Sequence, residues 1–103
     1  MDPLTGKQKR FLRGLGQRLA PAVHVGKAGL SETIVSATDK ALSHRELLKV
    51  RLPAEKPAAR RQIARDLAEA LDAHCVGVVG RTALLYRPNE ALPADRRVVT
   101  DWP

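Results

Sequence analysis

The short segment Gly26-Lys27-Ala28-Gly29 has the residue types and spacing that suit contact with phosphate groups. Glycine lets two backbones approach closely, and the free N–H groups at the start of a following helix favour a negatively charged oxygen. Lys27 places a mobile positive charge between the two glycines. Loops of this G-x-x-G form can clamp a nucleic-acid backbone. Two glycines at this spacing also occur in ordinary turns, so the segment alone leaves both interpretations open.

Basic residues are concentrated in the first quarter of the chain. The 103 residues include 18 Lys and Arg against 11 Asp and Glu, a net charge of +7. Residues 1–27 hold six of these basic side chains and one acid, whereas the other 76 residues hold 12 basic and 10 acidic ones. A basic face of this kind attracts a polyanion such as nucleic acid. An acidic protein would be attracted in the same way, and a solvated helix without a partner can carry the same charges.

The side chains that could support catalysis or metal binding are too scattered to form a site. His24, His44 and His74 share no metal-binding spacing with Cys75. His74 and Cys75 are neighbours, so on a strand they point to opposite faces. The sequence contains no nucleotide-hydrolysis motif. We therefore expect no enzymatic activity, no cofactor and no metal.

Composition also limits the setting in which the protein works. The single cysteine excludes an internal disulfide. No apolar run approaches the roughly 18–20 residues of a membrane span, and the first residues lack the apolar stretch of a signal peptide. We expect a monomeric, cytoplasmic protein that does not contact a membrane.

Apolar periodicity and end signals predict three helices and four strands. Thr5 and Gln8 fit a capping box at the start of the first helix, and Ser31 is the natural N-cap of the second. In chain order we expect a helix from Thr5 towards Pro21, a strand at 22–25, a helix from Ser31 to His44, a strand at 46–52, a helix at 58–73, and strands at 75–79 and 83–86.

These elements predict a single α+β domain, a small α/β sandwich of one four-stranded sheet with packed helices. An apolar stripe marks the expected buried face of the first helix, namely Phe11, Leu12, Leu15 and Leu19. After Pro88 the sequence becomes rich in proline and charge, so residues 89–103 are expected to form a flexible tail.

Four stretches, in this order and spacing, resemble the CRM domain (chloroplast RNA splicing and ribosome maturation) in its stand-alone bacterial form, the YhbY family. They are Leu4 to Lys9, Val25 to Leu30, His44 to Val50, and Val79 to Pro88. The resemblance thus covers a domain over residues 4–88. It implies a fold like that of the C-terminal domain of translation initiation factor three. It also implies binding to RNA, with a role in assembly of the large ribosomal subunit.

The resemblance implies that the loop of Gly26, Lys27, Ala28 and Gly29 contacts RNA. Ala28 stands where relatives often carry a polar residue, so this loop offers one charged side chain. We expect the first helix and the basic side of a strand to complete the interface, through Lys7, Lys9, Arg10, Arg13, Lys49 and Arg51. The expected partners are large-subunit ribosomal RNA and pre-ribosomal particles. Another structured RNA, DNA or an acidic protein are the alternatives.

Overall fold

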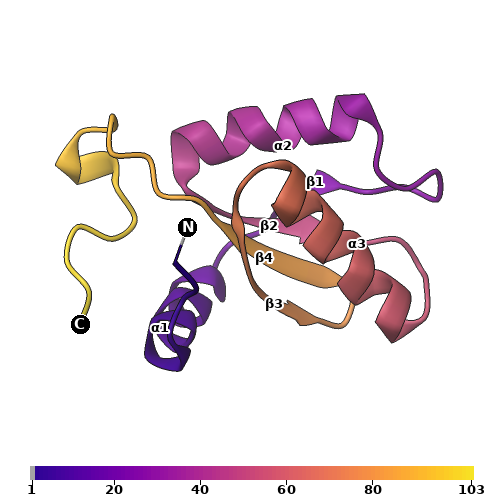
Figure 1. Cartoon of the computed structure of the whole chain (residues 1–103), viewed down its shortest axis with the longest axis horizontal. Coiled ribbons are helices and arrows are strands. Elements are labelled where there is room, and N and C mark those ends of the chain that lie inside the picture. The colour runs from indigo at the N-terminus through magenta and orange to yellow at the C-terminus, as the bar shows by residue number, and fades with distance from the viewer. Residues whose placement is uncertain (1) are drawn as a thin grey trace.

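The computed structural model describes residues 2–103, and a four-stranded sheet lies at its centre (Figure 1). The strand order is β1-β2-β4-β3, with β1 parallel to β2 and the other neighbours antiparallel. The C-terminal ends of β1 and β2 therefore lie at the same edge of the sheet as the turn between β3 and β4. The strands span Pro21–His24 (β1), Leu47–Arg51 (β2), His74–Val79 (β3) and Thr82–Tyr86 (β4).

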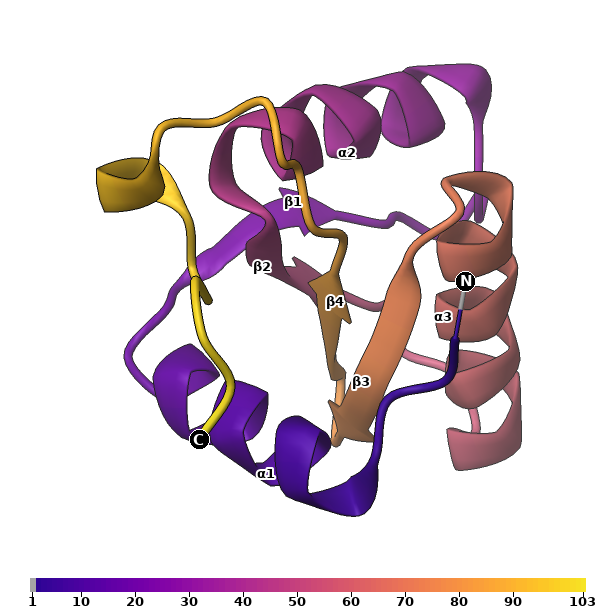
Figure 2. The same ribbon diagram turned by 60° about the vertical axis from the view of Figure 1, so that its left-hand side comes forward.

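Two helices, α2 (Glu32–Arg45) and α3 (Pro57–Ala70), cover one face of the sheet (Figures 1 and 2). The side chain of Ser31 accepts a hydrogen bond from the Ile34 N–H at 3.2 Å, which confirms the predicted cap of α2. A proline lies in the first turn of α3, where a backbone N–H would have no partner within the helix, so the missing N–H costs no hydrogen bond. Together with the sheet these helices enclose the larger core, whose buried residues include Leu42, Leu48, Val50, Leu67 and Leu85.

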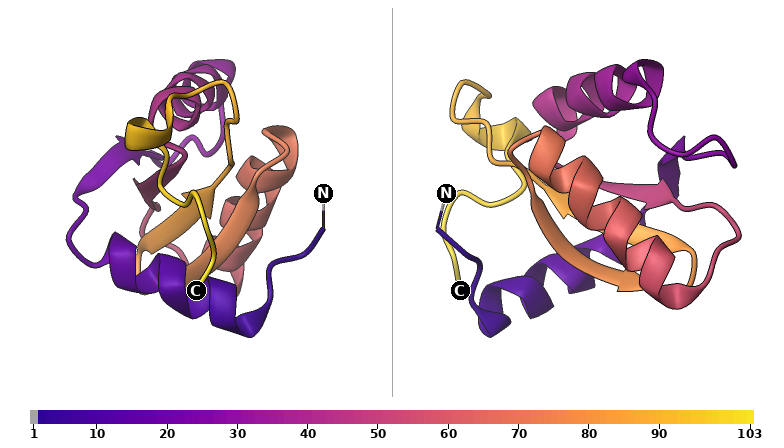
Figure 3. Two further views of the ribbon diagram at one scale, coloured as in Figure 1. Left: turned by 90° about the vertical axis from the view of Figure 1, so that its left-hand side faces the viewer. Right: turned by 45° about the vertical axis from the view of Figure 1, so that its right-hand side comes forward.

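The third helix, α1 (Gly6–Gly16), lies on the opposite face of the sheet (Figure 3). The predicted capping box is present: Thr5 Oγ1 accepts from the Gln8 N–H at 3.1 Å, and Gln8 Oε1 accepts from the Thr5 N–H at 2.9 Å. Leu12 is fully buried in the smaller core that α1 forms with the sheet. The helix covers only part of this face, because Val79 at the far end of β3 is 77% exposed.

The predicted apolar stripe of α1 is wrong for two of its four members. Leu15 and Leu19 are 41% and 37% exposed. The helix ends at Gly16, so Leu19 does not continue the helical spacing. Gly16 itself lies against the sheet, where a Cβ atom would be 2.9 Å from Leu84 Cδ1. This close approach of the backbone leaves Leu15 at the side of the helix and in contact with solvent.

The C-terminal segment returns to the α1 face of the sheet and contains a short 3₁₀ turn, η1 (Ala94–Arg96) (Figure 3). Val99 is buried, and the Trp102 ring lies edge-on to Phe11 and to Tyr86 with centroid distances of 6.0 Å. The predicted flexibility of residues 89–103 is a statement about motion in solution, and it stays a prediction. The domain boundary at residue 88 also stays a prediction.

The α+β fold class is confirmed, with three helices and four strands in the predicted order. Element ends differ from the predictions by a few residues at most strands and helices. The helix expected over 58–73 begins at Pro57 and ends at Ala70.

Candidate nucleic-acid interface

The glycine loop continues β1 beyond the edge of the sheet (Figure 1). The Val25 N–H donates to the Arg51 carbonyl at 2.8 Å, so the loop starts directly beside the end of β2. The Gly29 N–H donates to the Gly26 carbonyl at 2.9 Å and closes a tight turn. Gly29 has φ +78°, a conformation that strongly favours glycine. Lys27 is exposed at the tip of this turn.

The strand register places a row of side chains on the open part of the α1 face. His24 pairs with Arg51, Arg51 with Thr82, and Thr82 with Val79. Paired residues point to the same face of a sheet, and the neighbouring Val50 is buried under α2 and α3. Arg51 therefore points to the opposite, open face, as predicted from the alternation in β2.

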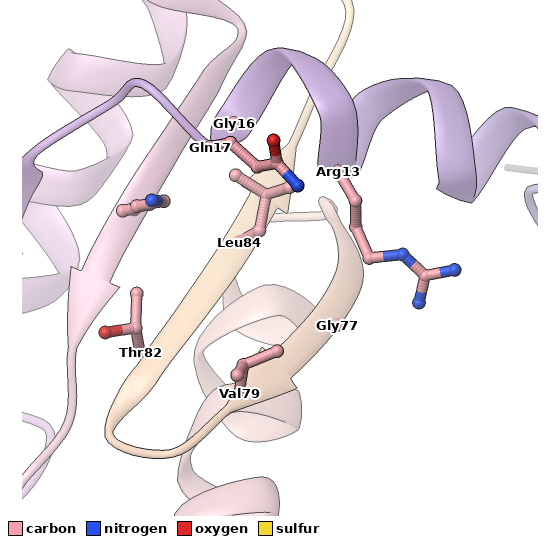
Figure 4. Close-up of a pocket in the computed structure, with 8 residues that line it drawn as sticks. Arg13, Gly16, Gln17, Gly77, Val79, Thr82 and Leu84 are labelled. Atoms are coloured by element: carbon pink, nitrogen blue, oxygen red, sulfur yellow. The ribbon is translucent and has the colours of Figure 1, made fainter.

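Lys49 and Arg13 reach the same open face from different elements. Figure 4 shows Arg13 extending from α1 over this face. Lys49 lies two residues before Arg51 on β2, and Arg13 extends from the last turn of α1. Both side chains line one cavity of about 410 Å³ between α1 and the sheet, with Gln17 and Thr82. The structure thus joins the glycine loop, β2 and the end of α1 into one surface. We call this the basic surface; it comprises Gly26–Gly29, Arg13, Lys49 and Arg51.

Lys7, Lys9 and Arg10 lie apart from this surface, on the first turns of α1. At about 1.5 Å per residue, Lys7 is roughly 9 Å from Arg13 along the helix axis. Lys9 is half-buried close to His74 and Cys75. These three residues extend the positive charge along α1 but do not line the cavity.

The cations of the basic surface are free to meet an external anion. Within residues 2–103 the ion pairs are Arg87 with Asp39 at 2.7 Å and Arg97 with Glu46 at 3.2 Å. Arg87 also donates to the Leu71 carbonyl at 3.0 Å, so it ties α2 to the end of α3. Arg87 serves an internal role. Arg81 is exposed in the turn beside Arg51, and its Nε donates to the Leu52 carbonyl at 3.2 Å.

Sequence reasoning missed three polar residues on the open face: His24, Gln17 and Thr82. The signal for His24 was present, because it alternates with the buried residues Val23 and Val25. Gln17 and Thr82 could not be found in this way. They approach the same cavity only because α1 crosses the sheet at Leu84.

The remaining histidine and cysteine side chains lie away from the basic surface. Cys75 packs against the larger core, and burial raises the pKa of its thiol. His74 stacks on Tyr86 on the other face, with a centroid distance of 6.1 Å, as the strand alternation predicted. Residues 2–103 contain no group of three or more His, Cys, Asp or Glu that could hold a metal ion. No helix among these residues is long and apolar enough to cross a bilayer.

This geometry defines a class of protein: a small α+β domain with an unpaired cationic surface beside a glycine turn. Residues 4–87 match the CRS1 / YhbY (CRM) domain, and the chain belongs to this family. A relative from Haemophilus influenzae, named RNA-binding protein, is 36% identical over 90 residues, which cover 87% of this chain and 91% of that protein.

Other relatives extend this similarity. A probable RNA-binding protein of Methanocaldococcus jannaschii is 44% identical over 91 residues, which cover 84% of this chain and 66% of that protein. A Staphylococcus aureus protein, solved in solution and described there as a candidate for RNA binding, superimposes with a TM-score of 0.77 at 36% identity. That match covers 84% of this chain and 91% of the other.

Proposed function

We propose that this protein binds structured RNA through the basic surface, mainly by contacts to phosphates. The observation that carries this proposal is the parallel pairing of β1 with β2. It places the glycine loop directly beside Arg51, as the 2.8 Å hydrogen bond from Val25 to Arg51 records. The RNA-binding names of the relatives support the same chemistry.

The geometry suits recognition of an RNA backbone. At the loop tip the backbone is free of bulky side chains, and a Cβ atom at Gly26 or Gly29 would meet no atom within 4 Å. A phosphate can therefore come close to the loop N–H groups while Lys27 supplies the charge. Lys49, Arg51 and Arg13 then offer further phosphate contacts along the sheet and α1.

We further propose that the RNA is that of large-subunit ribosomal precursors in the cytoplasm, where the bound protein guards a local RNA fold. The support is the family membership over residues 4–87. The proposal requires no enzymatic step. An acidic protein partner is the competing possibility, since the same cations would attract carboxylates.

Sedimentation of the tagged protein from a cell lysate tests this proposal, with and without ribonuclease. We expect co-migration with large-subunit precursors that is lost after nuclease or high salt. Association that survives nuclease would favour a protein partner instead. Protein found only at the top of a low-salt gradient would contradict ribosomal association.

A charge reversal in the loop tests the interface itself. Lys27→Glu should lower the affinity for large-subunit ribosomal RNA about tenfold, since one phosphate contact becomes a repulsion. Its thermal unfolding should not change, because Lys27 is exposed and forms no ion pair within residues 2–103. Lys40→Glu, on the exposed side of α2, makes the same charge change away from the basic surface. Equal affinities of the two variants would remove the loop from the interface.

A further inference from the structure

The cavity between α1 and the sheet is lined by residues of α1, β3 and β4, with Leu84 as an apolar residue at its centre (Figure 4). Leu84 and Gly77 line the cavity on the sheet side, and Gly16 lines it on the side of α1, which packs directly on Leu84. The Arg13 side chain crosses above Gly77, where a Cβ atom would lie 3.8 Å from Arg13 Cδ. The absence of a side chain at Gly77 thus lets the Arg13 chain lie against β3, and Figure 4 shows its guanidinium directed away from Gln17 and Leu84.

The walls of the cavity carry polar groups that a phosphate does not require. Gln17 offers an amide donor and acceptor, and Thr82 offers a hydroxyl that does both. Within residues 2–103 neither side chain forms a hydrogen bond to another protein group. Figure 4 shows Gln17 next to Leu84 and Thr82 further along β4. Side chains that can both donate and accept hydrogen bonds suit a ligand whose edge carries hydrogen-bond donors and acceptors.

We propose that this cavity takes one unpaired nucleobase of the bound RNA. The base would rest on Leu84 beside Gly77, and the exposed Arg13 side chain would swing over it to stack its planar guanidinium on the free face of the base. Its edge would meet Gln17 and Thr82. A volume of about 410 Å³ is enough for a base and part of its sugar. Lys49 at the cavity wall would hold the adjoining phosphate.

This inference rests on the proposed RNA binding and adds that the RNA must present an unpaired base. The surface would then distinguish a bulged or looped RNA from a continuous duplex. Phosphate contacts alone would bind the two with similar affinity.

Two hairpin RNAs that differ only in a single-nucleotide bulge test the inference. The wild-type protein should bind the bulged hairpin about tenfold more tightly, which is near the lower end of the effect of stacking one base on an aromatic ring, because Leu84 and Arg13 offer contact without a ring. Gly77→Val fills the sheet side of the cavity without changing any charge, so it should abolish the preference and leave the salt dependence of binding intact. Gly14→Ala, on the open side of α1, is the control and should keep the preference.

Gln17→Ala provides a second variant that does not alter the sheet, in case Gly77→Val folds poorly. It should reduce the preference for the bulge by several-fold, because one of the two edge contacts is lost. Equal wild-type affinity for the two hairpins, or a preference unchanged in both variants, would overturn the inference and leave RNA binding standing. Failure of the wild-type protein to bind either hairpin would instead contradict the proposed function.

Discussion

Glu46 is fully buried and connects the C-terminal segment to the sheet. Its carboxylate accepts from the Asn89 N–H at 2.6 Å and from the Val98 N–H at 2.7 Å, and it pairs with Arg97 at 3.2 Å. Its carbonyl accepts from the Arg87 N–H at 2.8 Å. A single buried carboxylate thus satisfies donors that lie 43 to 52 residues further along the chain.

Glu46→Ala should therefore destabilise the fold strongly. The free energy of unfolding should fall by about 3 kcal/mol, since two N–H groups and Arg97 lose their partner. Urea denaturation measures this change. Glu69→Ala removes an exposed carboxylate from α3 and should cost less than about 0.5 kcal/mol. Similar losses in the two variants would show that the Glu46 contacts do not stabilise the protein.

His74 makes the stability of the fold depend on pH, with lower stability at acidic pH. Burial lowers the pKa of His74 from its ordinary value of 6.5; the charge of Asp72 opposes this shift in part, and the charge of Lys9 adds to it. The folded chain therefore favours the neutral ring, while the unfolded chain takes up a proton as the pH falls through 6.5. The contribution of His74 to stability is complete above that pH and is lost below it.

The free energy of unfolding of the wild-type protein should consequently fall more than that of His74→Gln between about pH 7.5 and about pH 5. Chemical denaturation at both pH values measures the difference. Because every other titrating group is shared, the comparison isolates His74. Parallel pH profiles of the two proteins would contradict the assignment.

At the scale of secondary structure elements, local signals predicted most of the chain. The capping hydrogen bonds of Thr5, Gln8 and Ser31 join residues only three positions apart in the sequence. The helix starts that these residues predict therefore do not depend on the tertiary fold. The end of α1 was harder to predict, because the contact of Gly16 with Leu84 joins distant parts of the sequence. The role of Glu46 was missed for the same reason.

The C-terminal segment offers a test at this scale. Trp102→Ala should lower the free energy of unfolding by about 2 kcal/mol, because the ring loses its edge contacts with Phe11 and Tyr86. Trp102→Phe keeps an aromatic ring in place and should lose less. Since Trp102 is the only tryptophan, its fluorescence in the wild-type protein also reports whether the segment stays packed in solution. An unchanged stability of Trp102→Ala would favour the predicted flexible tail.

For the whole molecule, the fold class followed from the order of elements, but the candidate site depended on the strand order. Alternation in β2 predicted that Lys49 and Arg51 share a face. The pairing of β1 with β2, which sets the glycine loop beside them, has no local signal in the sequence. Lys7, Lys9 and Arg10 are predicted from charge alone to join this interface. They lie on the first turns of α1, apart from the cavity, and their contact with RNA stays a prediction.

The net charge of +7 and the unpaired cations of the basic surface indicate that the protein binds RNA mainly through phosphate contacts. The most direct test is the affinity for transcribed large-subunit ribosomal RNA over a series of salt concentrations. If about five phosphates are neutralised, log K should fall with log salt at a slope of roughly −3.5 to −4.5. An affinity that does not respond to salt would contradict the claim.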